Sequence, residues 1–181
     1  MEYFDSSRPK LEIRPWRILV YLPKGVDESE AFKIIEKHWK WIEKKHGELL
    51  KALEKAKNIE LVERSKAEFE TLVKKLVEQA MKDIVGVNAC RIIIRRMKTR
   101  WASCSPRGTI TINALARHLP NHLISYIVYH EICHLIEPRH NEAFWTCLKK
   151  HYPNHGELEE ELLAYELKLG LLTSIETSQR P

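Results

Sequence analysis

Two long helices are predicted in the first half of the chain from the spacing of its apolar residues. Between residues 32 and 53, apolar side chains recur every three or four positions, which places them on one face of a helix. The apolar members of this seam are Phe32, Ile35, Trp39, Ile42, Leu49 and Leu53, and His46 occupies the seam position between Ile42 and Leu49. The same spacing runs over residues 69–84, after a break near Asn58. Asp27 begins a capping-box pattern ahead of the first helix, so we expect a helical hairpin over residues 28–86.

Three short segments show instead the alternation or the β-branched content of strands. Residues 11–22 alternate imperfectly and are bounded by prolines, as in an edge strand. Residues 91–96 include three consecutive isoleucines, and residues 109–113 alternate with a period of two. Residues 105–108 (SPRG) have turn chemistry. We expect one small sheet that holds all three strands, with the last two as an irregular antiparallel pair.

The last third of the chain is predicted to be helical. Pro120 suits the first position of a helix, and apolar residues follow it. That helix must end near Glu137, because Pro138 comes next. A short helix near Asn141 and another over residues 156–169 complete the pattern. We expect an α+β fold, in which the small sheet packs against these helices.

The overall composition agrees with a folded protein of one domain and an appendage. The chain has 181 residues, of which 44% are apolar and 30% are charged. No apolar run approaches the roughly 18 residues that a membrane span needs, and the first residues do not resemble a secretory signal. We therefore expect a cytoplasmic protein, without a membrane segment, whose cysteines are reduced thiols. These are Cys90, Cys104, Cys133 and Cys147.

Charge is distributed unevenly, although the net charge is only +5. No Asp or Glu occurs between Asp83 and Glu131, and the stretch 84–130 is rich in arginine. Its Arg and Lys residues are Arg91, Arg95, Arg96, Lys98, Arg100, Arg107 and Arg117. Such a stretch suits nucleic acid or an acidic substrate, and it is also common as solvated surface. Nucleic-acid binding is therefore an open alternative.

The candidate chemistry centres on an HExxH motif at residues 130–134. On a helix, His130 and His134 lie four positions apart on one face, so both imidazoles can reach one ion. The motif lies in a strongly apolar helix, where two unpaired histidines and a glutamate would be costly to bury without a purpose. We therefore predict a zinc site, with Glu131 as the general base that takes a proton from water.

A catalytic zinc ion needs a third protein ligand and an open fourth position. His140 follows His134 by six residues, and the helix stop at Pro138 lets the chain turn back toward the metal. The alternatives are carboxylates of a later helix, namely Glu157, Glu160 and Glu161. We favour His140, because local spacing constrains it, and expect one Zn²⁺ per chain. The candidates for stabilising the oxyanion are Arg100, Tyr152 and Tyr165.

Several segments besides the motif resemble the YgjP-like metallopeptidase family, whose relatives include SprT-like and WLM domains. They are residues 95–105 (RRMKTRWASCS), residues 110–113 (ITIN), residues 126–135 (YIVYHEICHL), and His140 followed by Phe144 and Trp145. The resemblance implies a zincin-like minimal metallopeptidase core. It also implies metal ligands at His130, His134 and His140, with Glu131 as the base.

Two departures from the family pattern bear on the architecture. The family's Trp-Gly-Ser-Cys segment has alanine at position 102 here, which is tolerable unless that backbone needs a positive φ. Many members have a strand pair after the first helix, where this chain reads as helical. We expect a strand and helical hairpin over residues 1–86, a catalytic core over 87–172 and a flexible tail over 173–181.

The function expected from these features is zinc-dependent hydrolysis of a peptide or protein substrate. An extended peptide could pair with the edge of strand 109–113. The residues expected to contact it are Thr111, Asn113, Arg100 and Trp101, the last being alternatively a core residue. Two other functions stay open: a SprT-like protease associated with nucleic acid through residues 84–130, and a zinc-bound interaction module with little catalysis. The oligomeric state is not specified by the sequence.

Overall fold

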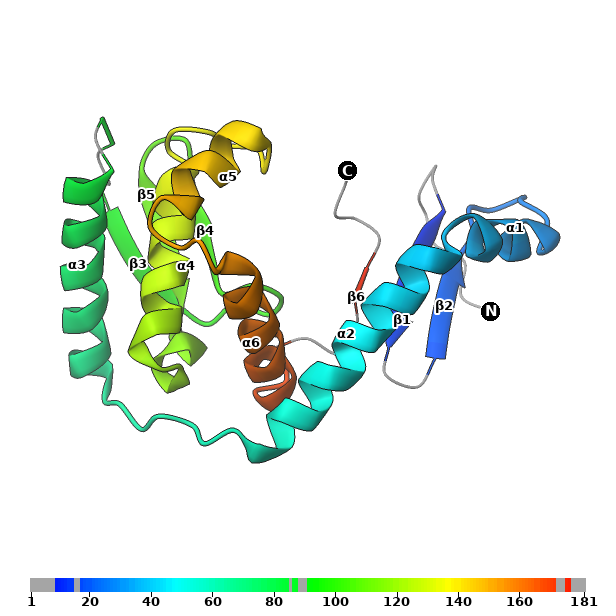
Figure 1. Ribbon diagram of the computed structural model, residues 1–181, viewed down its shortest axis with the longest axis horizontal. Helices are drawn as coiled ribbons and strands as arrows, with labels where there is room; N and C mark the ends of the chain where they lie inside the picture. Colours follow the sequence, from blue (N-terminus) through cyan, green and yellow to red (C-terminus); the bar gives the residue numbers. More distant parts are fainter. Residues whose placement is uncertain (1–8, 15–16, 85, 88–90, 172–174, 177–181) are drawn as a thin grey trace. The chain divides into compact units, whose positions relative to one another are not determined.

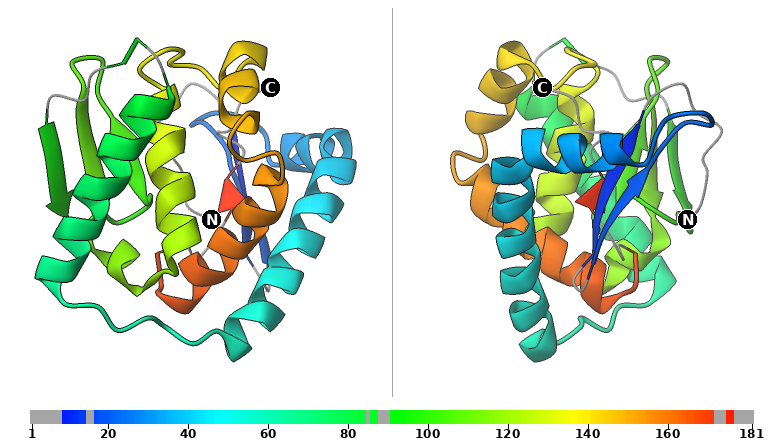
Figure 2. Two further views of the ribbon diagram at one scale, coloured as in Figure 1. Left: turned by 60° about the vertical axis from the view of Figure 1, so that its left-hand side comes forward. Right: turned by 90° about the vertical axis from the view of Figure 1, so that its right-hand side faces the viewer.

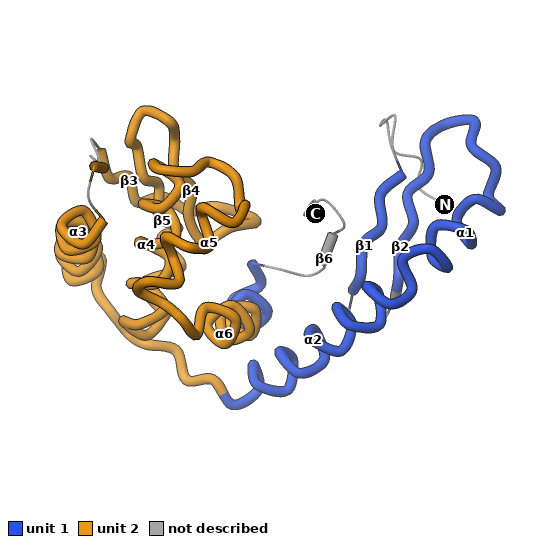
Figure 3. Tube along the Cα trace, turned by 45° about the horizontal axis from the view of Figure 1, so that its top comes forward, with its two compact units in different colours: residues 1–58, 166–181 blue, residues 59–165 orange. Residues whose placement is uncertain are grey.

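The computed structural model describes residues 9–14, 17–84, 86–87, 91–171 and 175–176, which fall into two compact units (Figures 1 and 3). Unit 1 comprises the described residues of 1–58 and 166–181, and unit 2 comprises those of 59–165. The boundary at residue 58 lies inside the segment that the sequence assigns to one N-terminal region. Most of the predicted tail lies outside the described residues.

Unit 1 contains a three-stranded antiparallel sheet in the order β2-β1-β6. Its strands are β1 (Lys10–Arg14), β2 (Arg17–Tyr21) and β6 (Ile175–Glu176). The prediction of one strand over residues 11–22 is wrong, because this stretch folds back on itself and pairs Leu11 with Val20. These strands also form a sheet of their own and do not join the strands that follow residue 90.

Two helices pack on this sheet in place of the single predicted seam. α1 (Ser29–Lys37) ends at His38, and α2 (Trp39–Asn58) begins directly after it. Ile42 and Leu49 of α2 are buried against Leu11 and Ile13 of β1. Phe32 and Trp39, which the seam placed with them, are 75% and 53% exposed. The helical spacing was therefore predicted correctly, but only its second half is buried.

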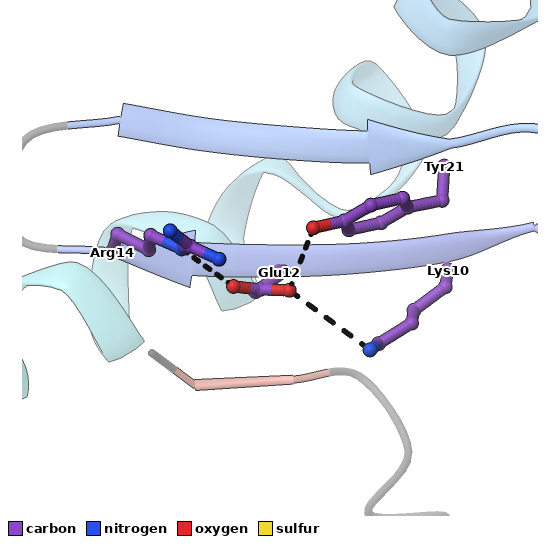
Figure 4. Close-up of polar contacts among 4 residues, drawn as sticks. All are labelled: Lys10, Glu12, Arg14 and Tyr21. Carbon is purple, nitrogen blue, oxygen red and sulfur yellow. Dashed lines mark hydrogen bonds and ion pairs between the residues drawn. The ribbon is translucent and has the colours of Figure 1, made fainter. Parts of the chain in front are cut away.

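Glu12 is a buried acid on β1, surrounded by polar side chains from the same hairpin (Figure 4). Its carboxylate accepts hydrogen bonds from Arg14 Nε at 2.6 Å and from Tyr21 Oη at 3.0 Å. Lys10 Nζ lies 3.9 Å from the same carboxylate. The buried charge is thus compensated by neighbours on two adjacent strands.

Unit 2 begins with a short linker and a well-capped helix, α3 (Lys66–Asp83). Ser65 and Glu68 form a capping box, each accepting from the other's backbone N–H. The Arg64 guanidinium donates to the Leu119 carbonyl and to the Asn121 side chain, which ties the linker to the helix that begins at Asn121. The predicted hairpin helices are both present, with α2 in unit 1 and α3 in unit 2.

The sheet of unit 2 has the order β3-β5-β4. β3 (Arg91–Arg95) is parallel to β5 (Thr109–Asn113), and β4 (Ala102–Cys104) is antiparallel to β5. The predicted antiparallel pairing of β3 with β5 is therefore wrong, because β4 reverses the chain between them. The turn over 105–108 forms as expected, with Gly108 at φ +77° and its N–H donating to the Ser105 carbonyl.

A short 3-10 helix, η1 (Ala114–His118), and three α-helices complete unit 2 and confirm the α+β fold. α4 (Asn121–Cys133) lies beside α3 and contacts β4 (Figures 1 and 2). It ends four residues before the predicted limit at Glu137. α5 (Glu142–Lys149) and α6 (His155–Lys168) follow, close to the predicted positions. None of the helices in the described part of the chain combines the length and apolar character needed to cross a membrane.

Candidate metal centre

The C-terminal end of α4 presents the HExxH residues. Eight of the helix's residues besides Glu131 are buried, so its position is fixed by apolar packing on nearly every side. His130 lies in the last turn and His134 is the C-cap. Both imidazoles therefore project from one end of a rigid helix, as their spacing predicts.

A tight loop brings His140 back to the helix end. The Glu137 N–H donates to the Cys133 carbonyl at 3.0 Å, and the Glu137 carboxylate accepts from the Arg139 N–H at 3.1 Å. Asn141 then caps α5 by accepting from the Phe144 N–H. The Glu137 side chain thus stabilises this turn by accepting a hydrogen bond from the Arg139 backbone. A glycine at the same position would make the turn through its greater backbone freedom. The sequence places Glu137 at this position but does not show this role.

The three histidines converge on one point. Their available ligand atoms all lie within 4.8 Å of one another, and the Nε2 atoms of His130 and His140 are 3.0 Å apart. His134 Nδ1 lies 3.2 Å from the Glu137 carbonyl oxygen, which can only accept a hydrogen bond. The proton of His134 is therefore on Nδ1, which leaves the Nε2 lone pair for a metal ion.

Two aromatic residues of α5 support this cluster. Phe144 is fully buried, and its ring centroid lies 4.9, 4.5 and 4.7 Å from those of His130, His134 and His140. Trp145 Nε1 donates to the His140 carbonyl at 3.1 Å, so the loop is held to α5 at the ligand itself. Both aromatic residues therefore pack against the metal loop and hold His140 in place.

The protonation states suit a cation. Burial, together with the neighbouring imidazoles, lowers the pKa of His130 to about 3. Burial also lowers the pKa values of His134 and His140. Neutral imidazole is the form that coordinates metal, and a set of three histidines is one of the donor sets of catalytic zinc sites. The residues present therefore fit a zinc-type metal ion. Among the described residues, these three histidines are the group able to hold such an ion, and no α6 carboxylate joins them.

Glu131 directly follows His130 on α4 and is 8% exposed. Burial raises the pKa of its carboxyl group to about 7, against an ordinary value of 4.5. The charge of Arg100 acts in the opposite direction and lowers it. No ion pair or hydrogen bond to the Glu131 side chain is found in the part of the chain that the structure describes, so the cost of burying its charge outweighs the effect of Arg100 and the carboxyl group keeps its proton up to near neutral pH.

The segment 100–104 runs close to Glu131, because two of its side chains interact with the carboxylate electrostatically. Arg100, which is exposed, is one. Cys104 is the other, and burial together with the Glu131 charge raises the pKa of its thiol to about 11. Of the residues predicted to contact substrate, Arg100 is thus brought near the Glu131 carboxylate. Ala102 lies in this segment without a positive φ, so alanine replaces the family's glycine there without strain.

The other three predicted substrate residues lie in the interior. Trp101 and Thr111 are 6% and 8% exposed, and Asn113 is fully buried. The Asn113 amide donates to the carbonyls of Met97 and Arg100 at 3.0 and 2.9 Å, so it holds the loop that precedes β4. Sequence reasoning missed this role. The sequence signal that could have suggested it is an asparagine at the end of an apolar strand, because a buried amide there needs hydrogen-bond partners.

The expectation that a peptide adds to the edge of residues 109–113 is wrong. β5 is the central strand, and both of its edges are already paired, one with β3 and one with β4. β4 is an edge strand that contacts α4, and the interaction of its Cys104 with Glu131 places it close to the HExxH segment.

The remaining candidates have other partners. Glu161 lies 3.0 Å from His122, and the Tyr152 hydroxyl donates to Ser125 Oγ at 2.7 Å. Tyr165 is buried in α6. Cys104, Cys133 and Cys147 are free thiols, the last two with Sγ atoms 2.8 Å apart between α4 and α5, and Cys90 lies outside the described residues.

Comparison with known proteins identifies the family. The YgjP-like metallopeptidase domain matches residues 54–165, which is more than half of the chain. This chain belongs to the YgjP-like metallopeptidase family. The match includes α3, the mixed sheet and the histidine cluster, and it ends within α6. No curated protein matches the sequence significantly.

Two solved structures are similar to this YgjP-like protein. One is the metallopeptidase zymogen of Pyrococcus abyssi abylysin, with 32% identity and a TM-score of 0.47, over 54% of this chain and 95% of that chain. The other is the metallopeptidase zymogen of Methanocaldococcus jannaschii jannalysin, with 23% identity and a TM-score of 0.46, over 55% of this chain and 97% of that chain. Both similarities leave a large part of this chain without a counterpart.

Proposed function

We propose that this metallopeptidase is zinc-dependent, with one ion per chain held by His130, His134 and His140 and with Glu131 as general base. The convergence of three neutral imidazoles beside a buried carboxyl group carries the proposal. When bound, the metal supplies Lewis acidity that activates water and polarises a carbonyl oxygen. The remaining steps are performed by side chains of the chain itself.

Glu131 moves the proton. A pKa near 7 leaves its carboxyl group partly ionised at neutral pH, so it can take a proton from water and return it to the leaving amine. Its side chain is not committed to any hydrogen bond among the described residues, so both oxygens are available. Arg100 lies where its charge acts on Glu131, and we assign it to the carbonyl or carboxylate of the substrate.

The substrate would be an extended peptide that pairs with β4. This strand combines contact with α4 and a position at the edge of the sheet, which strand addition requires. Main-chain hydrogen bonds of this kind tolerate many side chains. A broad peptide or protein substrate class is therefore expected.

The decisive experiment compares Glu131→Gln with wild type on an unfolded protein or peptide library. Glutamine keeps the shape but cannot accept the proton, so activity should fall by about 10²–10⁴-fold while zinc content stays at about one per chain. Glu78→Gln is the matched control, because Glu78 is exposed on α3 and lies outside this site. Equal cleavage by wild type and Glu131→Gln would refute the mechanism.

A zinc-loaded wild type that cleaves nothing would favour the alternative of a zinc-bound interaction module. The nucleic-acid-associated alternative remains a prediction from the basic stretch 84–130, as does a cytoplasmic location. Duplex DNA binding with a steep negative salt slope would support that alternative.

A further inference from the structure

The outer edge of β3 is a second unpaired strand edge, at the opposite side of the sheet from β4. Among the described residues, β3 pairs with β5 alone (Figure 2). The Arg91 N–H donates to the Gly108 carbonyl at 3.4 Å, so it faces β5. Because successive N–H groups of a strand point to opposite edges, those of Ile92 and Ile94 face outward. Each offers a donor and a carbonyl acceptor to an added strand.

The side chains of β3 give this edge a distinct chemistry. Ile92 and Ile94 are in register with the buried Ile110 and Ile112 and face the core side. Arg91, Ile93 and Arg95 occupy the other face, because side chains alternate along a strand. Both arginines are exposed, and the three isoleucines are only half-buried. The edge therefore presents apolar surface between two positive charges.

We propose that the β3 edge is a docking surface for an extended acidic segment of another protein. An added strand places its side chains about 5 Å from the residues directly opposite. The complementary segment has an acid opposite Arg91, an acid opposite Arg95 and β-branched residues between. Acids four positions apart on a strand share one face, as the two arginines do. The proposal does not depend on the proposed peptidase mechanism.

A second copy of this chain is a poor occupant of the same edge. Pairing two β3 strands antiparallel about Ile93 sets Arg91 of one copy opposite Arg95 of the other, at both ends. Parallel pairing in register sets each arginine opposite itself. Like charges directly opposite are destabilising. The charge pattern thus disfavours self-association and favours an acidic partner.

The test uses the full-length protein and a fluorescein-labelled peptide with the core Glu-Val-Thr-Val-Glu between polar flanks. Fluorescence anisotropy should detect saturable binding. The double variant Arg91→Glu/Arg95→Glu should bind at least about tenfold more weakly, because two attractive cross-strand pairs become repulsive. A peptide with lysines in place of both glutamates should recover binding to this variant. The matched control is Lys149→Glu/Lys150→Glu, which changes the same number of exposed charges at the end of α5.

Backbone pairing is tested from the side of the peptide, so that a folding defect of the protein cannot mimic the result. N-methylation at the residues whose N–H groups would face Ile92 and Ile94 should abolish binding, and N-methylation at the alternate residues should not. Equal binding by both methylated peptides would overturn the proposal, as would no binding by the unmodified peptide. Competition by duplex DNA that depends on Arg91 and Arg95 would also overturn it, in favour of a nucleic-acid surface. Glu131→Gln should bind the peptide like wild type, which separates this result from a failed test of catalysis.

Discussion

Two buried glutamates, one in each unit, show how differently the same side chain can be held. Glu12 is 4% exposed and Glu131 is 8% exposed. Glu12 is surrounded by Arg14, Tyr21 and Lys10 (Figure 4). These contacts in turn raise the pKa of Arg14, while burial and the Glu12 hydrogen bond raise that of Tyr21.

Glu131 has no such partners among the described residues, and its buried carboxyl group has a pKa near 7. Glu12, whose charge is compensated, stabilises its hairpin. The charged form of Glu131 is destabilised by burial, and a nearby cation would relieve that destabilisation. What distinguishes a structural carboxylate from a candidate catalytic one here is its set of partners and not its depth.

The largest expected effect is the loss of zinc binding, because zinc is the cation proposed to lie near Glu131. His140→Ala should weaken zinc binding by more than about 100-fold, beyond the 10–100-fold loss typical of residues that only support a ligand. The measurement is competition with a zinc-chelating dye at pH 7.5. The triple variant Glu157→Gln/Glu160→Gln/Glu161→Gln should retain the wild-type affinity. Retention by His140→Ala, with loss in the glutamate variant, would transfer the third ligand to α6.

The second prediction concerns the stability of the metal-free protein. Folding raises the pKa of Glu131 from 4.5 to about 7, so the folded state holds a proton that the unfolded state releases between these values. The contribution of Glu131 to stability is therefore fully present below pH 4.5 and is lost as pH rises through 7. Glu131→Gln removes this penalty and should stabilise the metal-free protein by about 2–3 kcal/mol at pH 8, with little effect at pH 4.5.

Thermal unfolding with a chelator present checks this prediction. Adding zinc should reduce the difference between Glu131→Gln and wild type, because a neighbouring cation favours the charged carboxylate. A variant that is less stable than wild type at pH 8 would show that Glu131 has stabilising partners after all. It would then resemble Glu12, and the comparison would fail.

More of the candidate site than of the fold could be predicted from the sequence. His130, Glu131, His134 and His140 are linked by short spacings, so local helix geometry and one proline constrain where they lie. Strand pairing is not local in this way. The pattern of residues 109–113 defines a strand, but its parallel partner β3 is determined by the return of the chain through β4. The pattern of alternation carries no information on that choice.

Glu12 shows a second limit of the same kind. In the sequence it is one polar residue in an imperfectly alternating run, which predicts a solvent-facing side chain. Its burial depends on the fold-back of β2, which brings Tyr21 next to it, and on Lys10 and Arg14 flanking it on the same face of β1. A pattern along one strand cannot reveal compensation that comes from the neighbouring strand.

The third prediction concerns Glu12→Gln, which is the substitution already considered at Glu131. Glu12→Gln should destabilise the protein by about 1–2 kcal/mol at pH 8, because the hydrogen bonds that Arg14 and Tyr21 donate lose their charged acceptor. The sign is opposite to that expected for Glu131→Gln under the same conditions. Urea unfolding of both variants beside Glu78→Gln provides the measurement. Two variants that shift stability in the same direction would abolish the distinction between the two acids.

The smallest expected effect concerns Arg100, the charge found to act on Glu131 among the described residues. Arg100 lowers the pKa of this carboxyl group, although burial outweighs it. Arg100→Leu should therefore raise that pKa further, and Arg107→Leu, which removes an exposed charge elsewhere, should not. Carboxyl ¹³C NMR titration of the metal-free protein measures the shift without relying on activity. In the zinc-loaded enzyme, the acidic limb of the kcat/KM profile should move to higher pH, because a weaker acid loses its proton later. If Arg100→Leu leaves the titration of Glu131 unchanged and only raises KM, Arg100 acts in substrate binding alone. The pKa of Glu131 would then be determined by burial, with no contribution from the Arg100 charge.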